Sequence, residues 1–331
     1  MSANPAPHPV APGRRLLPGA GPSVSAVAMS VEPVGATAGD RTIALLQRAH
    51  RAGVTTFDVS GARNPALGLQ LVRRAFADSE GPLEVLIDLS PERLLGDRTE
   101  PATGAQASEG VVYDELRRVR ERVPGRTTVI ALLPPPRIPS AGALFATAVR
   151  RAVDDRLLQA FARRCPAPGR LPEAEEARGT ADSGTFAGAL SLLEPELVGP
   201  MRDRAALGPA ALIALDPFAA GRLDGSAFSA ALGTRTPDRP PPTVRALHEA
   251  FDPVLRLGFL TEGTSRSLAQ AALRFVTQWS WVATVVIPMP TPERFDEMLA
   301  AASTPAISEA ELERIAAICD GVAAPRAGPG A

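Results

Sequence analysis

The chain has 331 residues, 45% of them hydrophobic, and its 35 basic and 36 acidic residues leave a net charge of −1. This balance gives no support for a nucleic-acid partner, and no apolar run approaches the ~20 residues that span a membrane. There is no signal-peptide pattern, and Cys165 and Cys319 are spaced neither as a disulfide framework nor as metal ligands, so we expect a soluble cytoplasmic protein without a metal site.

All 35 basic residues are arginine, and the sequence contains no lysine. Lysine is ordinarily among the commonest residues of a protein. Two explanations stay open: codon bias in a GC-rich genome, or selection against free amines in a protein that meets an amine-reactive ligand such as an aldehyde. Under either explanation, a catalytic or Schiff-base lysine is excluded.

The patterning along the chain predicts alternating strands and helices. The first 22 residues, rich in proline and alanine, predict a flexible arm. Short runs of β-branched and other apolar residues predict buried strands at 24–30, 54–59, 83–89, 128–133, 157–162, 185–191, 211–215 and 282–288. Amphipathic segments predict helices at 42–53, 67–75, 111–123, 143–153, 195–207, 244–257, 267–276, 291–299 and 309–319.

This alternation favours an α/β fold of the (β/α)8 TIM-barrel type over an open sheet. No G-x-G-x-x-G motif follows a strand, so a Rossmann dinucleotide site has no support. We expect a single barrel domain over residues 23–320 and a flexible tail over 321–331.

Four segments, spread in order along most of the chain, carry a resemblance to a known family. Residues 49–76 contain A-G-V-T-T-F-D and a helical pattern, residues 115–136 a helix and a strand ending in L-L-P-P-P, and residues 190–225 the motifs L-S-L-L-E-P-E-L and P-F-A-A-G-R-L-D-G. Residues 267–299 contain L-A-Q-A-A-L-R-F-V, a strand ending in I-P and a helix opened by P-E-R. Together these segments resemble the aldo-keto reductases, which implies a barrel of the aldo-keto reductase type.

The resemblance implies a site of Asp, Tyr, Lys and His at the barrel mouth, where the tyrosine gives a proton to a carbonyl. Asp58 matches the aspartate. The tyrosine position falls on Arg63, the lysine position on Asp88 or Leu89, and the histidine position on Pro134. Since the single tyrosine of the chain lies in a predicted helix elsewhere, a phenolic proton donor is not expected.

The resemblance also implies an NADPH site, with the phosphates at the turn after the last strand. Here that turn, 287–291, contains two prolines, and each removes an N–H that could bind phosphate. Arg294 and Glu297 match the family's adenosine-side residues, but Leu215–Asp216 stands where a Tyr-Ser pair contacts the nicotinamide. We therefore expect a vestigial site and no cofactor, with NADPH as the cofactor if the site survives.

The barrel mouth is the candidate site, because active sites of such barrels lie at the C-terminal ends of the strands. Two carboxylates there can divide acid and base work if their environments separate their pKa values. The candidate catalytic residues are Asp58, Asp88 and Arg63, and the candidate ligand-binding residues are Arg137, Asp216 and Arg222. The alternative for Asp58 or Asp88 is a structural salt bridge to Arg63 or Arg137.

Three functions stay open at this point. The first is a repurposed enzyme that acts on a small, carbonyl-bearing metabolite without hydride transfer, as a cyclase, dehydratase or isomerase of specialised metabolism. The second is a non-catalytic pseudoenzyme that binds a partner protein or a small ligand. The third is a divergent NADPH-dependent carbonyl reductase. Because one fold hosts many activities, the resemblance does not choose among them.

Overall fold

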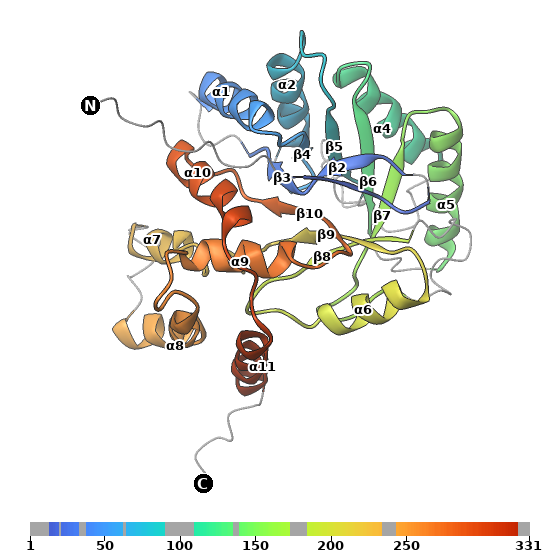
Figure 1. The fold of residues 1–331 in the computed structure, drawn as a ribbon. Helices are drawn as coiled ribbons and strands as arrows, with labels where there is room; N and C mark the ends of the chain where they lie inside the picture. Colours follow the sequence, from blue (N-terminus) through green and yellow to red (C-terminus); the bar gives the residue numbers. More distant parts are fainter. Residues whose placement is uncertain are drawn as a thin grey trace.

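The computed structural model describes residues 13–19, 21–32, 38–61, 64–89, 109–134, 139–172, 184–233 and 243–323. Eight parallel strands form a closed barrel, in which β10 pairs with β3 (Figure 1). In barrel order the strands are β3 (Val27–Ser30), β4 (Thr56–Asp58), β5 (Glu84–Asp88), β6 (Thr128–Leu133), β7 (Ala160–Arg164), β8 (Thr185–Ala189), β9 (Ala211–Leu215) and β10 (Val282–Ile287).

Helices surround the barrel (Figure 1), and most of them contribute buried apolar residues to the core outside it, whereas the described residues of α7 and α8 contribute none. They are α1 (Ala38–Arg51), α2 (Pro65–Ala75), α4 (Glu109–Arg122), α5 (Pro139–Asp154), α6 (Val198–Leu207), α7 (Ser226–Gly233), α8 (Val244–Arg256), α9 (Leu268–Thr277), α10 (Pro292–Ala300) and α11 (Glu309–Ala323). Two short 3-10 turns, η1 (Leu257–Leu260) and η2 (Ala301–Ser303), follow α8 and α10. This order explains the near-continuous apolar strands, because each strand is buried on both faces.

A second, smaller apolar cluster fills the inside of the barrel. Its members combine small and branched side chains: Leu17, Val24, Ala28, Leu86, Ile130, Leu132, Ala162, Ala187, Ala211, Ile213, Ala283 and Val286. Side chains alternate between the two faces of a strand, so residues two positions from these also face the interior. This register identifies the residues at the mouth.

A β-hairpin closes the N-terminal end of the barrel. Its strands, β1 (Arg14–Leu16) and β2 (Ser23–Ser25), are antiparallel, and Leu17 and Val24 join the inner apolar cluster. Arg14 donates to Thr55 Oγ1 at 2.6 Å and to Glu84 Oε1 at 2.7 Å, where β4 and β5 begin. The prediction of a flexible arm through residue 22 is therefore wrong for this hairpin, which is held by buried contacts with distant segments.

Other boundaries also differ from the sequence-based expectations. The expected strand 24–30 is interrupted at Ala26 between β2 and β3, and the expected strand 157–162 is displaced to β7. Leu157 and Leu158 are apolar but belong to the turn before β7, where Leu158 is buried. Helix α7 was not expected, and α11 continues to Ala323, beyond the boundary predicted at residue 320.

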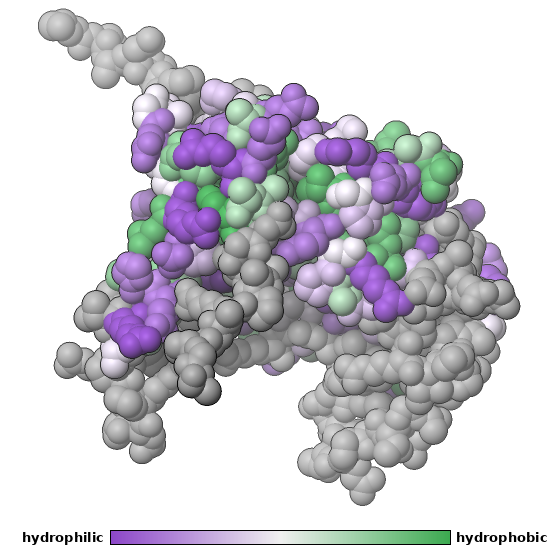
Figure 2. Space-filling view, turned by 90° about the horizontal axis from the view of Figure 1, so that it is seen from below, coloured by the Kyte–Doolittle hydropathy of each residue, from purple (hydrophilic) through white to green (hydrophobic). Residues whose placement is uncertain are grey.

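No helix in the described part of the chain is long and apolar enough to cross a membrane. The same residues contain no cluster of three or more His, Cys, Asp or Glu side chains placed to hold a metal ion. On the face drawn in Figure 2, hydrophilic and hydrophobic side chains are interspersed over the described residues.

Candidate active site at the barrel mouth

Three charged side chains lie on the inner face of the barrel at its C-terminal end. Asp58 is the last residue of β4 and pairs in register with Leu86 of the inner cluster. Asp88 ends β5 two residues beyond Leu86, and Arg164 ends β7 two residues beyond Ala162, another inner residue. Strand alternation therefore directs Asp58, Asp88 and Arg164 toward one site.

Asp58 is buried, with 4% of its surface exposed. Its Oδ1 accepts a hydrogen bond from the backbone N–H of Ser60 at 2.8 Å. Burial raises the pKa of Asp58, and the nearby charge of Asp88 adds to this, whereas Ser60 and Arg164 oppose it. A carboxyl group whose pKa is raised toward the working pH can both take up and release a proton.

Asp88 and Arg164 form an ion pair beside Asp58, with Arg164 Nη2 3.4 Å from Asp88 Oδ2. The side chains of Asp88 and Arg164 are 9% and 29% exposed, so the pair is largely shielded from water. The preceding residue, Arg163, faces the opposite way and lies over the ring of Phe186, 5.1 Å from its centroid. Of the two adjacent arginines, Arg163 therefore lies on the outer face of the strand, and Arg164 lies in the site on the inner face.

The structure brings together only part of the set predicted from the sequence. Asp58 and Asp88 share one site, as expected, while Arg63 and Arg137 lie outside the described residues. Asp216 and Arg222 belong to the loop after β9, where Arg222 Nη2 is 3.7 Å from Glu194 Oε1. Among the described residues, the charged groups that act on Asp58 are Arg164 and Asp88.

Arg164 was not among the candidate site residues predicted from the sequence. The expected strand ended at residue 162, which hid the arginine at the true strand end. The available signal was a cation two residues after Ala162, which places it on the same inner side of the strand.

The other residue types of the family's site lie away from the mouth. Tyr113 is in α4, and its hydroxyl donates to Asp155 Oδ2 on the outer surface. His50 Nε2 is 3.1 Å from the carbonyl oxygen of Pro82, which precedes β5 at the closed end of the barrel. His248 is exposed on α8, and His8 lies outside the described residues.

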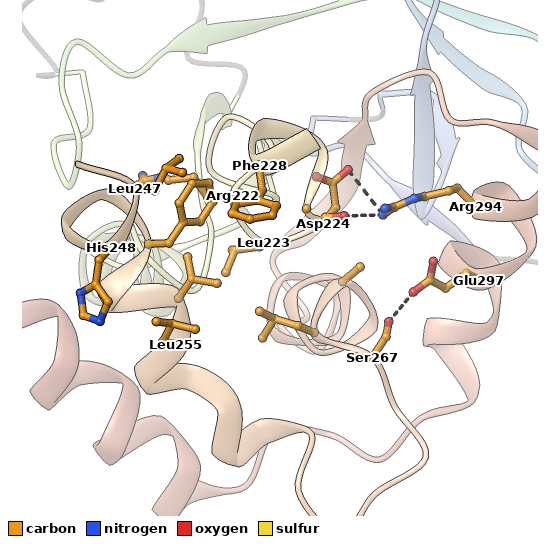
Figure 3. Close-up of a pocket in the computed structure, with 15 residues that line it drawn as sticks. Arg222, Leu223, Asp224, Phe228, Leu247, His248, Leu255, Ser267, Arg294 and Glu297 are labelled. Carbon is orange, nitrogen blue, oxygen red and sulfur yellow. Dashed lines mark hydrogen bonds and ion pairs between the residues drawn. The ribbon is translucent and has the colours of Figure 1, made fainter. Parts of the chain in front are cut away.

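Arg294 and Glu297, the residues matched to the adenosine side of the family's cofactor site, do lie together. Both line a cavity of ≈ 750 Å³ between the loop after β9 and helices α7, α8, α9 and α10 (Figure 3). Arg294 donates to the backbone oxygen of Asp224, and Glu297 accepts from the hydroxyl of Ser267.

Three backbone N–H groups of this region, those of Ala220, Ser226 and Glu293, are already bound by the chain's own carboxylates. Both oxygens of Asp216 accept from Ala220 N, at 2.8 and 2.9 Å, and Asp224 accepts from Ser226 N at 3.0 Å. At the start of α10, hydrogen bonds from its own backbone N–H and from Thr291 lower the pKa of Glu293.

The loop after β9 is shaped around these contacts. Asp216, Ala219 and Ala220 have φ angles of 49°, 51° and 56°. Such left-handed conformations cost roughly 1 kcal/mol or more for a residue other than glycine. A pyrophosphate would have to displace Asp216, Asp224 and Glu293, and it would find prolines at 288, 290 and 292 without donors. The residues present do not fit a dinucleotide.

Comparisons with known proteins agree with the fold. No family model matches the sequence, and no curated protein matches it. Solved structures do: the glycerol dehydrogenase from Gluconobacter oxydans superposes with a TM-score of 0.71 at 15% identity, covering 96% of this chain and 98% of that chain. The holo form of an aldo-keto reductase from Bacillus halodurans gives a TM-score of 0.67 at 14% identity, with 92% and 95% covered.

A thermostable aldo-keto reductase solved with the inhibitor epalrestat also gives a TM-score of 0.67, at 13% identity, with 92% and 99% covered. At these identities the similarity defines the fold. The chain is an aldo-keto-reductase-like TIM barrel, which confirms the predicted fold class.

Proposed function

We propose that this barrel acts on a small, carbonyl-bearing metabolite by proton transfer at its mouth, without hydride transfer from NADPH. The observation that carries the proposal is the convergence of Asp58, Asp88 and Arg164 on the inner face of the C-terminal rim. Asp58 would move the proton, because its buried carboxyl has a raised pKa. Isomerisation, dehydration and cyclisation of carbonyl compounds all need such a group.

Arg164 would bind the carbonyl oxygen of the substrate. Removing a proton next to a carbonyl leaves negative charge on that oxygen, and a fixed cation in a partly buried site stabilises it. The ion pair with Asp88 would hold the guanidinium in place, as a supporting residue does for a catalytic group. Asp88 is thus a positioning residue in this proposal.

The alternative of an NADPH-dependent reductase is less well supported, because carboxylates bind the donor groups that phosphates would need. A purely ligand-binding or partner-binding barrel would retain the same architecture but show no turnover. The following experiment separates these functions.

The test is cofactor-free exchange of hydrogen next to a carbonyl, followed by proton NMR in D₂O with a panel of hydroxyketones, hydroxyaldehydes and dicarbonyl compounds. We expect the wild type to accelerate loss of the α-proton signal of at least one compound. The control variant Leu207→Ser, which changes an exposed residue of α6, should accelerate it equally. A panel that exchanges only at the buffer rate, or a rate that does not depend on Asp58, would contradict the proposal.

Replacing Arg164 with methionine is expected to move the acid limb of the exchange rate to higher pH. Arg164 lowers the pKa of Asp58, so its loss raises that pKa, and the ionised base becomes available only at higher pH. The measurement is the pH–rate profile of both proteins. As a control, Arg245→Met removes an exposed arginine paired with Glu249 on α8 and should leave the pH–rate profile unchanged. If Arg164→Met also leaves the profile unchanged, Arg164 does not tune the pKa of the catalytic base.

A further inference from the structure

The cavity outside the barrel has the dimensions of a ligand site. It lies between α7, α8, α9 and α10, with the loop 222–225 along one side (Figure 3). Its volume of ≈ 750 Å³ falls within the roughly 300–1,000 Å³ of pockets that bind small molecules. The mechanism proposed for the barrel mouth does not use it.

One side of this cavity is apolar. Leu247, Phe251 and Leu255 recur at intervals of four residues along α8 and so lie on one face of the helix. Phe228 of α7 meets the ring of Phe251 edge-on, with the ring centroids 5.4 Å apart. Phe228 is 44% exposed and Leu255 is 63% exposed, so water contacts large apolar side chains inside a concave site.

The opposite side is polar, and its charged side chains already have ionic or hydrogen-bonding partners within the chain. Arg294 lies 4.0 Å from the carboxylate of Asp224 and donates to its backbone oxygen, and Glu297 accepts from Ser267 (Figure 3). Arg222, at the same edge, pairs with Glu194. A charged ligand would compete with these contacts, whereas an uncharged ligand would leave all of them intact.

We propose that this cavity, independently of the barrel mouth, binds an uncharged and largely hydrophobic small molecule, such as an aromatic or cyclic aliphatic compound with one hydrogen-bonding group. Its apolar part packs against Phe228, Phe251 and Leu255. Its polar group lies on the side of Arg294 and Ser267. The residues matched to an adenosine site by sequence thus line a pocket whose chemistry favours a different class of ligand.

The test is a fluorescence titration with N-phenyl-1-naphthylamine, a neutral hydrophobic dye. We expect saturable binding to the wild type with one dye per chain. The double variant Phe228→Ser/Leu255→Ser should bind at least about tenfold more weakly, because it removes the exposed apolar wall. Leu207→Ser changes a residue of α6 that is 85% exposed and should bind like the wild type, which controls for dye adsorbed to exposed leucines.

Both substituted side chains are partly or largely exposed, so the double variant should keep its fold, as circular dichroism can verify. Leu255→Ser alone provides a second variant, with a smaller loss expected. Dye binding that does not saturate, that is equal in the wild type and the two cavity variants, or that NADP⁺ displaces would overturn the proposal. The exchange activity of the barrel mouth should be unaffected by Phe228→Ser/Leu255→Ser, which keeps the two proposals separate.

Discussion

Asp58→Asn is expected to slow cofactor-free proton transfer by about 10²–10⁴-fold, the usual contribution of a general acid or base. Asparagine keeps an oxygen that can accept from the N–H of Ser60 but cannot take up a proton. The loss should therefore be one of chemistry, not of folding. The measurement is the exchange rate of the best substrate of the NMR panel, compared with that of the wild type.

The same substitution is expected to make the protein more stable at pH values above the pKa that Asp58 has in the folded protein. Burial raises the pKa of Asp58 in the folded state, so the folded protein holds this proton at pH values where the unfolded chain has released it. The stabilising effect of that proton is complete below the pKa that Asp58 has in the unfolded chain. It is lost as the pH rises through the higher pKa that Asp58 has in the folded protein. Above the folded pKa a buried carboxylate remains, and asparagine removes its desolvation cost.

Chemical denaturation of both proteins across this pH range measures the effect. The wild type should lose stability relative to Asp58→Asn as the pH rises, and the difference should level off above the folded pKa. A variant that is inactive and also less stable than the wild type at every pH tested would indicate a structural role for Asp58 in place of the catalytic one.

Arg14→Ala is expected to lower the free energy of unfolding by about 3 kcal/mol or more. Arg14 is the ionic partner of Glu84, whose side chain is only 3% exposed at the closed end of the barrel. Thr55 and Thr56 donate to Glu84 Oε2, at 2.6 and 3.0 Å, but they do not balance its charge. A buried carboxylate without its cation is strongly destabilising, much more than the loss of an exposed ion pair.

Denaturant unfolding of three variants, each compared with the wild type, separates the cost of an unpaired buried carboxylate from the loss of an ion pair. Arg74→Ala breaks an exposed pair with Asp40 and should change stability by less than about 1 kcal/mol. The double variant Arg14→Met/Glu84→Gln removes both charges and should recover much of the stability lost in Arg14→Ala. If Arg14→Ala is as mild as Arg74→Ala, the hairpin does not depend on this ion pair.

The local pattern of apolar and polar residues was sufficient to predict most strands of the barrel. The strands β6 and β9 were predicted at their observed bounds, because each is a continuous apolar run ended by a polar or proline residue. The hairpin was missed because its stability depends on contacts far away in sequence, between Arg14 and Glu84 and between Leu17 and the inner cluster. Composition near a terminus does not contain that information.

The candidate site was predictable only where a charge coincides with a predicted strand end. Asp58 and Asp88 satisfy this condition. Arg164 does not, since apolar Leu157 and Leu158 shifted the predicted strand toward the preceding turn. The contact of the Asp216 carboxylate with Ala220 lies in a stretch where Asp216, Ala219 and Ala220 have left-handed backbone conformations, which alanine residues do not indicate from the sequence.

We propose that this aldo-keto-reductase-like barrel works without a dinucleotide. The most direct test of this claim is calorimetric titration of the purified protein with NADPH and NADP⁺ in buffer of low phosphate content. The triple variant Asp216→Asn/Asp224→Asn/Glu293→Gln, which removes the competing carboxylates, serves as a comparison. We predict no binding to the wild type at millimolar cofactor; a dissociation constant in the micromolar range would contradict the claim and restore the reductase as the leading function.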